Sequence, residues 1–132
     1  MTTQTRRDYW LDKPDRFYRL FWGKFEEVQG QPILIEGWGE LDCYLHRDME
    51  EGWSVNDGVT GTVFRHPKGA LGFATTEEAI VVAMECLNNG GRSEFLRWRD
   101  HWINQYGPSP RYAWADFEAG ESFTLLGRVK DE

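Results

Sequence analysis

The chain has 132 residues, with 22 acidic and 15 basic side chains and a formal net charge of -7. Aromatic residues make up 15% of the chain and charged residues 28%, which excludes a disordered acidic tail, and two cysteines are too few for a disulfide scaffold. A chain of this length can bury enough apolar surface for one core, so we expect a single globular domain.

No apolar run is long enough to cross a membrane. The longest such run covers 79–84, whereas a spanning helix needs about 20 apolar residues. Arg6 and Arg7 are not followed by the apolar stretch of a secretory signal. We therefore expect a cytoplasmic protein without membrane contact, in which Cys43 and Cys86 are small buried hydrophobic residues rather than a disulfide.

The N-terminal part of the chain can be interpreted in two ways. Residues 1–11 are expected to form a polar arm, and residues 12–132 one α+β domain. The helical spacing of apolar residues over 13–28, after the capping residue Asp12, predicts a helix. The alternation within 16–22, followed by Gly23, leaves a β-hairpin as the alternative.

The middle of the chain has the period of half-buried strands. Apolar and polar residues alternate over 33–45, and the pattern returns at 53–55 and 59–65. The sequence Asn56-Asp57-Gly58 is typical of a tight turn, and 66–69 marks another turn before 70–74. These signals predict an antiparallel meander of about four to five strands.

Two helices are predicted after the meander. Thr75 and Glu78 form a capping box, an apolar stripe runs to Leu87, and the glycines at 90–91 end this first helix. A second helix follows over 93–106, stopped by Gly107-Pro108, with aromatic residues at 95, 98, 102 and 106 on one side. Residues 122–129 are expected to form a last strand. The predicted fold is thus a β meander packed against two to three helices.

Catalytic and metal-binding signals are weak. Cys43 and His46 are three residues apart on a predicted strand, which places them on opposite faces, and His66 lies elsewhere. No phosphate loop, nucleophile elbow or dinucleotide fingerprint is present in the sequence. We therefore predict no catalytic residue, metal or cofactor, and keep a small enzyme with a Cys/His site as an alternative.

The acidic charge is concentrated in one region. Residues 21–60 contain nine acidic and two basic side chains, which gives this segment a charge of -7. Acidic groups steer a protein toward a basic partner, and aromatic anchors dominate interface energy. The leading hypothesis is a non-enzymatic binding protein that recognises a basic protein surface, or a nucleic-acid-binding surface of a partner, through Glu36, Trp38, Glu40, Asp42, Glu50, Glu51 and Trp53.

The predicted second helix suggests a different function. Basic and aromatic side chains interleave there, as they do in proteins that pair with phosphates and stack on bases. A nucleic-acid-binding accessory protein is therefore an alternative, using Arg92, Arg97, Trp98 and Arg99. Direct nucleic-acid binding is disfavoured by the acidic balance of the whole chain.

Three short motifs carry a resemblance. Gly52-Trp53-Ser54-Val55, Thr60-Gly61 and the segment 75–80 (TTEEAI) resemble a strand-strand-helix unit of small uncharacterised phage and plasmid proteins, over 52–87. Many of those proteins have a His before the Thr-Gly turn, where this chain has 56–59 (NDGV). The resemblance carries no catalytic residue. It implies a mobile-element origin and an anti-CRISPR-like inhibitor that occupies a functional surface of a host defence complex.

Overall fold

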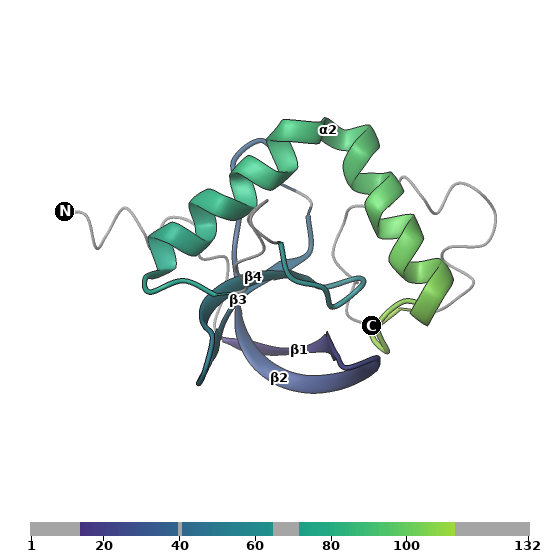
Figure 1. Ribbon diagram of the computed structural model, residues 1–132, viewed down its shortest axis with the longest axis horizontal. Coiled ribbons are helices and arrows are strands. Elements are labelled where there is room, and N and C mark those ends of the chain that lie inside the picture. The colour runs from purple at the N-terminus through teal and green to yellow at the C-terminus, as the bar shows by residue number, and fades with distance from the viewer. Residues whose placement is uncertain (1–13, 40, 65–71, 113–132) are drawn as a thin grey trace.

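The computed structural model describes residues 14–39, 41–64 and 72–112. These residues form one four-stranded antiparallel sheet and one long helix that arches over it (Figure 1). The elements in chain order are β1 (Asp15–Phe21), β2 (Lys24–Pro32), β3 (Cys43–Asp48), β4 (Gly52–Asp57) and α2 (Thr76–Tyr106). The α+β class is confirmed, whereas the described residues contain one helix and not two or three. The predicted arm 1–11, the turn 66–69 and the strand 122–129 lie outside the described residues.

The predicted helix over 13–28 is wrong, because this segment is the β1–β2 hairpin. The two strands pair without interruption from Asp15 opposite Gly30 to Phe21 opposite Lys24. Trp22 and Gly23 form the two-residue turn, with φ of 54° and 79°. Positive φ at both central residues is the geometry whose twist matches that of a hairpin. Alternation along 16–22 and the glycine at the turn therefore outweigh the helical spacing.

The remaining strands complete the antiparallel meander, with a short pairing of β2 with β3 and a longer pairing of β3 with β4. β2 pairs with β3 only around Gln31 opposite Leu45, and β3 pairs with β4 from Cys43 opposite Asp57 to Asp48 opposite Gly52. The sheet order is β1-β2-β3-β4. The predicted turn at Asn56-Asp57-Gly58 is present but wider than expected, because the Asp57 N–H donates to the Thr62 carbonyl and strand pairing resumes only at Val63.

Helix α2 is bent in the middle. It begins as predicted, with the Glu78 N–H donating to Thr75 Oγ1 at 3.2 Å. Gly91 has φ 76° and ψ -174°, values open almost only to glycine, so the two predicted helices are two arms of one bent element. The second arm ends at Gly107, whose N–H donates to the Ile103 carbonyl. Figure 1 shows the two arms descending on opposite sides of the bend.

The main core lies between the first arm of α2 and one face of β3 and β4. Ala79, Ala83 and Leu87 face this core from the helix, and Cys43, Leu45 and Val55 face it from the sheet. The Trp38 Nε1–H donates to Asn88 Oδ1 at 2.9 Å and ties the preceding loop to the same arm. Within the described residues, no helix combines the length and apolar composition needed to span a bilayer.

Candidate functional site

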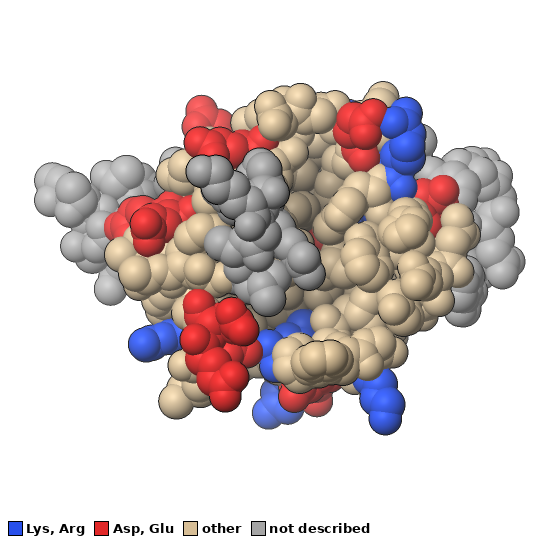
Figure 2. Space-filling model, viewed as in Figure 1, with Lys and Arg blue, Asp and Glu red and all other residues tan. Residues whose placement is uncertain are grey.

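The described residues enclose a cavity of about 780 Å³, which is lined by the tip of the β1–β2 hairpin, by residues 62–64 and by both arms of α2. We call it the aromatic groove, because six of its lining residues are aromatic: Trp22, Phe64, Phe95, Trp98, Trp102 and Tyr106. The rest of its lining is aliphatic or polar: Leu20, Gly23, Thr62, Val63, Cys86, Leu87, Asn89 and Glu94. In Figure 2, the surface below the second arm of α2 is mostly tan, with few charged side chains.

The second arm of α2 supplies one wall of the aromatic groove. Phe95, Trp98, Trp102 and Tyr106 recur every three or four residues and therefore share one side of the helix. Phe95 is buried, Trp98 and Trp102 are half-buried, and Tyr106 is exposed, so this row leads from the core to the surface. Its rings are ordered by stacking, with the Phe64 and Trp98 centroids 5.4 Å apart and those of Trp102 and Tyr106 5.8 Å apart.

The hairpin tip supplies the opposite wall. Trp22 is 87% exposed. Its backbone has φ 54°, in the left-handed region that L-residues rarely occupy. A Cβ added to Gly23 would lie 3.6 Å from Tyr106 Cε1, so the tip lies beside the outer end of the second arm. The hairpin thus presents a large aromatic side chain to solvent at the rim of the aromatic groove.

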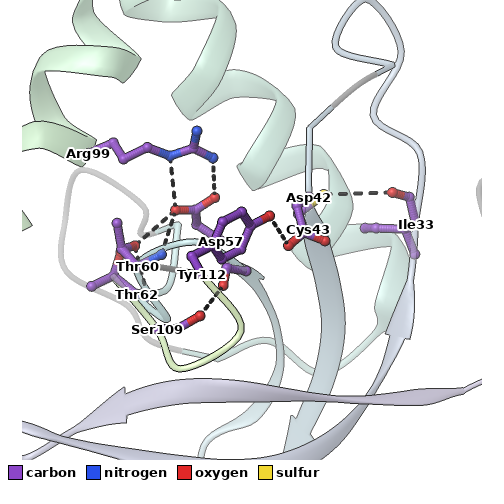
Figure 3. A network of polar contacts seen from close by, with 10 residues as sticks. Ile33, Asp42, Cys43, Asp57, Thr60, Thr62, Arg99, Ser109 and Tyr112 are labelled. Carbon is purple, nitrogen blue, oxygen red and sulfur yellow. Dashed lines mark hydrogen bonds and ion pairs between the residues drawn. The ribbon is translucent and has the colours of Figure 1, made fainter. Parts of the chain in front are cut away.

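A buried ion pair links the second arm of α2 to the end of β4 (Figure 3). The Arg99 guanidinium donates to both carboxylate oxygens of Asp57, with Nη2 to Oδ1 at 2.7 Å and Nε to Oδ2 at 3.3 Å. Arg99 is 1% exposed and Asp57 0%. Asp57 Oδ2 also accepts the backbone N–H and the hydroxyl of Thr60. Because buried charges are stable only when paired and hydrogen-bonded, this network fixes the helix against the turn after β4.

A second buried contact extends this support to the segment after α2. The Tyr112 hydroxyl donates to Asp42 Oδ2 at 2.8 Å, and the Ser109 hydroxyl donates to the Gly58 carbonyl. Burial, and next the negative charge of Asp42, raise the pKa of Tyr112 far above its usual range. Tyr112 therefore stays neutral and acts as a hydrogen-bond donor, and these contacts join the segment after α2 to the residues around β3 and β4.

The predicted partner-binding residues do not share one surface. Glu36, Glu50 and Glu51 are exposed, Trp53 is half-buried, and Glu40 lies outside the described residues. Trp38 and Asp42 are buried, Asp42 with only 1% exposure. Of the residues predicted for partner binding, Trp38 and Asp42 are therefore part of the interior and not of the exposed surface. Backbone bonds from Trp38 to Ile35 and from Leu41 to Trp38 form turns, so strand alternation begins only at Cys43.

The four residues predicted for nucleic-acid binding also differ in their exposure to solvent. Arg92 and Arg97 are exposed, whereas Trp98 is half-buried in the aromatic groove and Arg99 is buried and is not among the residues that line the groove. Arg97 makes an ion pair with Glu94, three residues earlier on the helix. Of these four residues, Arg92 and Arg97 are therefore the two that are exposed to solvent.

Cys43 and His46, two of the three residues of the predicted Cys/His alternative, do not converge. Cys43 faces the main core, where its thiol donates to the Ile33 carbonyl, whereas His46 lies against Phe17 on the other side of β3. His66 lies outside the described residues. Burial, with an opposing contribution from the Gln29 carbonyl, lowers the pKa of His46. In the part of the chain that the structure describes, no group of three His, Cys, Asp or Glu side chains is arranged to hold a metal ion.

Sequence reasoning missed the aromatic groove because its lining comes from segments that are far apart in sequence: 20–23, 62–64 and the two arms of α2. The signal that could have located it was Trp22-Gly23 between two alternating segments, which marks a hairpin tip with an exposed Trp. In comparisons with protein-family models, curated proteins and solved structures, nothing matches this chain. Functional inference therefore depends on the geometry of the molecule itself.

Proposed function

We propose that this protein is a non-enzymatic binding protein that captures a protein partner with a basic surface, and that the aromatic groove and Trp22 form its recognition face. The observation that carries this proposal is Trp22, which is 87% exposed in a left-handed backbone conformation at the rim of a groove with six aromatic lining residues. Trp and Tyr side chains near the centre of an interface supply most of its binding energy.

The backbone conformation of Trp22 is costly, and the exposed side chain makes few contacts that would offset the cost. A non-glycine residue in the left-handed region costs about 1–2 kcal/mol. The side chain of Trp22 is mostly in solvent, and the ring contact described for it is an edge contact with the neighbouring Phe21 at 5.9 Å. Exposed aromatic surface beside a groove is typical of a binding site. Recognition of a partner gives this arrangement a function.

Charge favours a basic partner. The chain has a net charge of -7, and Glu36, Glu50 and Glu51 are exposed on its surface. Long-range attraction increases the rate of encounter with an oppositely charged surface. A nucleic-acid-binding host defence complex, the target implied by the resemblance of residues 52–87, has a surface of this kind.

Capture of a partner by the tagged full-length chain tests the proposal. Proteins bound from the native host are identified by mass spectrometry, and the affinity for the purified partner is then measured for Trp22→Asn. We expect this variant to bind at least about tenfold more weakly, the size of a typical hot-spot loss. The matched control is Met49→Asn, at the tip of the β3–β4 turn, where Met49 is 95% exposed away from the aromatic groove. Equal binding by W22N and the wild type would refute the proposal.

A further inference from the structure

The aromatic groove carries charge of only one sign. Of its described lining residues, Glu94 is the one with an ionised side chain at neutral pH, and no Lys or Arg is among them. We propose that the groove binds the cationic side chain of a Lys, methylated Lys or Arg residue in a basic peptide segment, held over its indole rings. This inference rests on the proposed function and specifies the chemistry that the recognition face reads.

The ring faces of the groove suit a cation. An ammonium or guanidinium group within about 6 Å of an aromatic centroid is attracted by the negative face of the ring, most strongly for Trp. The fold already uses this interaction, since Arg19 Cζ lies 4.3 Å from the Phe21 centroid and Arg99 Cζ lies 4.6 Å from that of Phe95. In the described part of the chain, Trp22, Trp98, Trp102 and Tyr106 have no cation of their own.

Glu94 supplies the complementary charge at the mouth of the groove. Its side chain is 58% exposed, and its ion pair with Arg97 is equally open, since Arg97 is 69% exposed. Exposed pairs of this kind add little stability, so the carboxylate can accept a hydrogen bond from an incoming cation without a large loss. An anionic ligand would meet both this carboxylate and the negative ring faces. The groove therefore favours a cation over a phosphate.

The size of the groove fits a side chain with its flanking backbone. A volume of about 780 Å³ lies within the range of pockets that enclose small organic ligands. The groove is lined by the hairpin tip, by residues 62–64 and by both arms of α2, so a side chain that enters it can contact several rings. Asn89 offers an amide at the edge for the peptide backbone.

Matched peptides test the charge requirement directly. The probes are short Gly/Ser peptides with a central Lys, trimethyllysine, Arg or the neutral tert-butyl isostere of trimethyllysine, titrated into the full-length ¹⁵N-labelled protein. We expect the indole N–H signals of Trp22, Trp98 and Trp102, assigned with Trp→Phe variants, to shift with the cationic peptides. Trimethyllysine should bind at least about fivefold more tightly than its neutral isostere. Glu94→Gln should weaken cation binding about threefold, whereas Glu85→Gln, at an exposed acid on the first arm of α2, should leave it unchanged.

Each other outcome overturns the inference. Equal affinity for the isostere would show an apolar groove without charge selectivity, and no shift with any peptide would show that these rings are not accessible. Shifts with oligo-dT in place of the peptides would assign the groove to nucleic acid, and shifts that depend on protein concentration alone would assign it to a second copy. If the cationic peptides bind while W22N retains its partner, the proposed function fails and the inference stands. If W22N loses its partner while the isostere binds equally well, only the inference fails.

Discussion

Arg99 shows how a single side chain can change its expected role once the chain is folded. In the sequence it lies among basic and aromatic residues and looks like a nucleic-acid contact, but in the structure it is buried against Asp57. The two residues are 42 positions apart, so no local pattern could indicate the pair. Its burial leaves Phe95, Trp98 and Trp102 on the groove side of the same arm.

Removal of Arg99 should strongly destabilise the protein. Arg99→Met leaves the buried carboxylate of Asp57 without its cationic partner, and we expect the free energy of unfolding to fall by about 3–5 kcal/mol. The double variant Asp57→Asn/Arg99→Met should recover part of this loss, because it removes both charges. Urea denaturation measures the effect. Arg97→Met, which removes an exposed guanidinium, should change stability by less than about 0.5 kcal/mol, and an equal loss in both single variants would contradict the assigned role of the buried pair.

Asp48 should make stability depend on pH in the acid range. Its carboxylate accepts hydrogen bonds from Arg19 and from the backbone N–H groups of Glu50 and Glu51, and these bonds lower its pKa to about 2 from 3.8. Because the unfolded chain binds the proton more readily, the stabilisation is complete above about pH 4 and is lost as the pH falls through about 2. The side chain is partly solvated, so we expect about 1–2 kcal/mol. Unfolding of the wild type and Asp48→Asn should therefore differ at pH 6 and converge toward pH 2; a constant difference would contradict this assignment.

At the scale of elements, two backbone conformations shape the aromatic groove. The turn at Trp22-Gly23 places the hairpin tip beside Tyr106, and Gly91 bends α2 so that its second arm turns away from the line of the first. Gly91 is needed at its position because its φ and ψ are strained for any residue with a Cβ. Trp22 is not needed in that sense, because Asn tolerates the same left-handed conformation better.

The hairpin turn should therefore be more stable without its Trp. Asn-Gly is the preferred pair for a two-residue turn with positive φ, so Trp22→Asn should leave the free energy of unfolding unchanged or raise it by up to about 1 kcal/mol. Trp22→Val should instead lower it by about 1 kcal/mol, because a β-branched residue is strained at positive φ. Chemical denaturation of the two variants checks this. A W22N variant clearly less stable than the wild type would show that Trp22 supports the fold rather than a binding function.

At the scale of the whole molecule, acidic charge and aromatic surface lie on different parts of the chain. The exposed acids Glu36, Glu50 and Glu51 are not among the residues that line the aromatic groove. From the proposed function we expect the acids to set the association rate with a basic partner and the aromatic side chains to set the dissociation rate.

Because these exposed acids lie outside the aromatic groove, we expect their replacement to change the association rate and not the dissociation rate. Glu50→Lys/Glu51→Lys changes the net charge from -7 to -3, because each reversal adds two positive charges. We expect the association rate with the captured partner to fall several-fold at low salt while the dissociation rate changes little. Surface plasmon resonance at low and high salt measures both rates, and Glu50→Gln/Glu51→Gln should have an intermediate effect. A faster dissociation without slower association would place these acids inside the interface.

The sequence by itself determined the features that depend on neighbouring residues. The start of α2 at Thr75, its glycine break and the antiparallel pairing of β3 with β4 were predicted, because capping and alternation act over a few residues. The lack of a long apolar run is likewise determined by the order of the residues, because the longest run covers only 79–84.

Only the tertiary structure decided between helix and hairpin at 13–28, and only it revealed the buried Asp42 and the aromatic groove. The hairpin is favoured because Phe17 is buried with its ring stacked 4.7 Å from that of Tyr44, a residue of another strand. Asp42 is buried because Tyr112, 70 residues away, donates to it. The groove exists because the hairpin tip, residues 62–64 and both arms of α2 come together in space. Such contacts join segments that are distant in sequence, and burial depends on which of them pack together, so periodicity along the chain does not contain them.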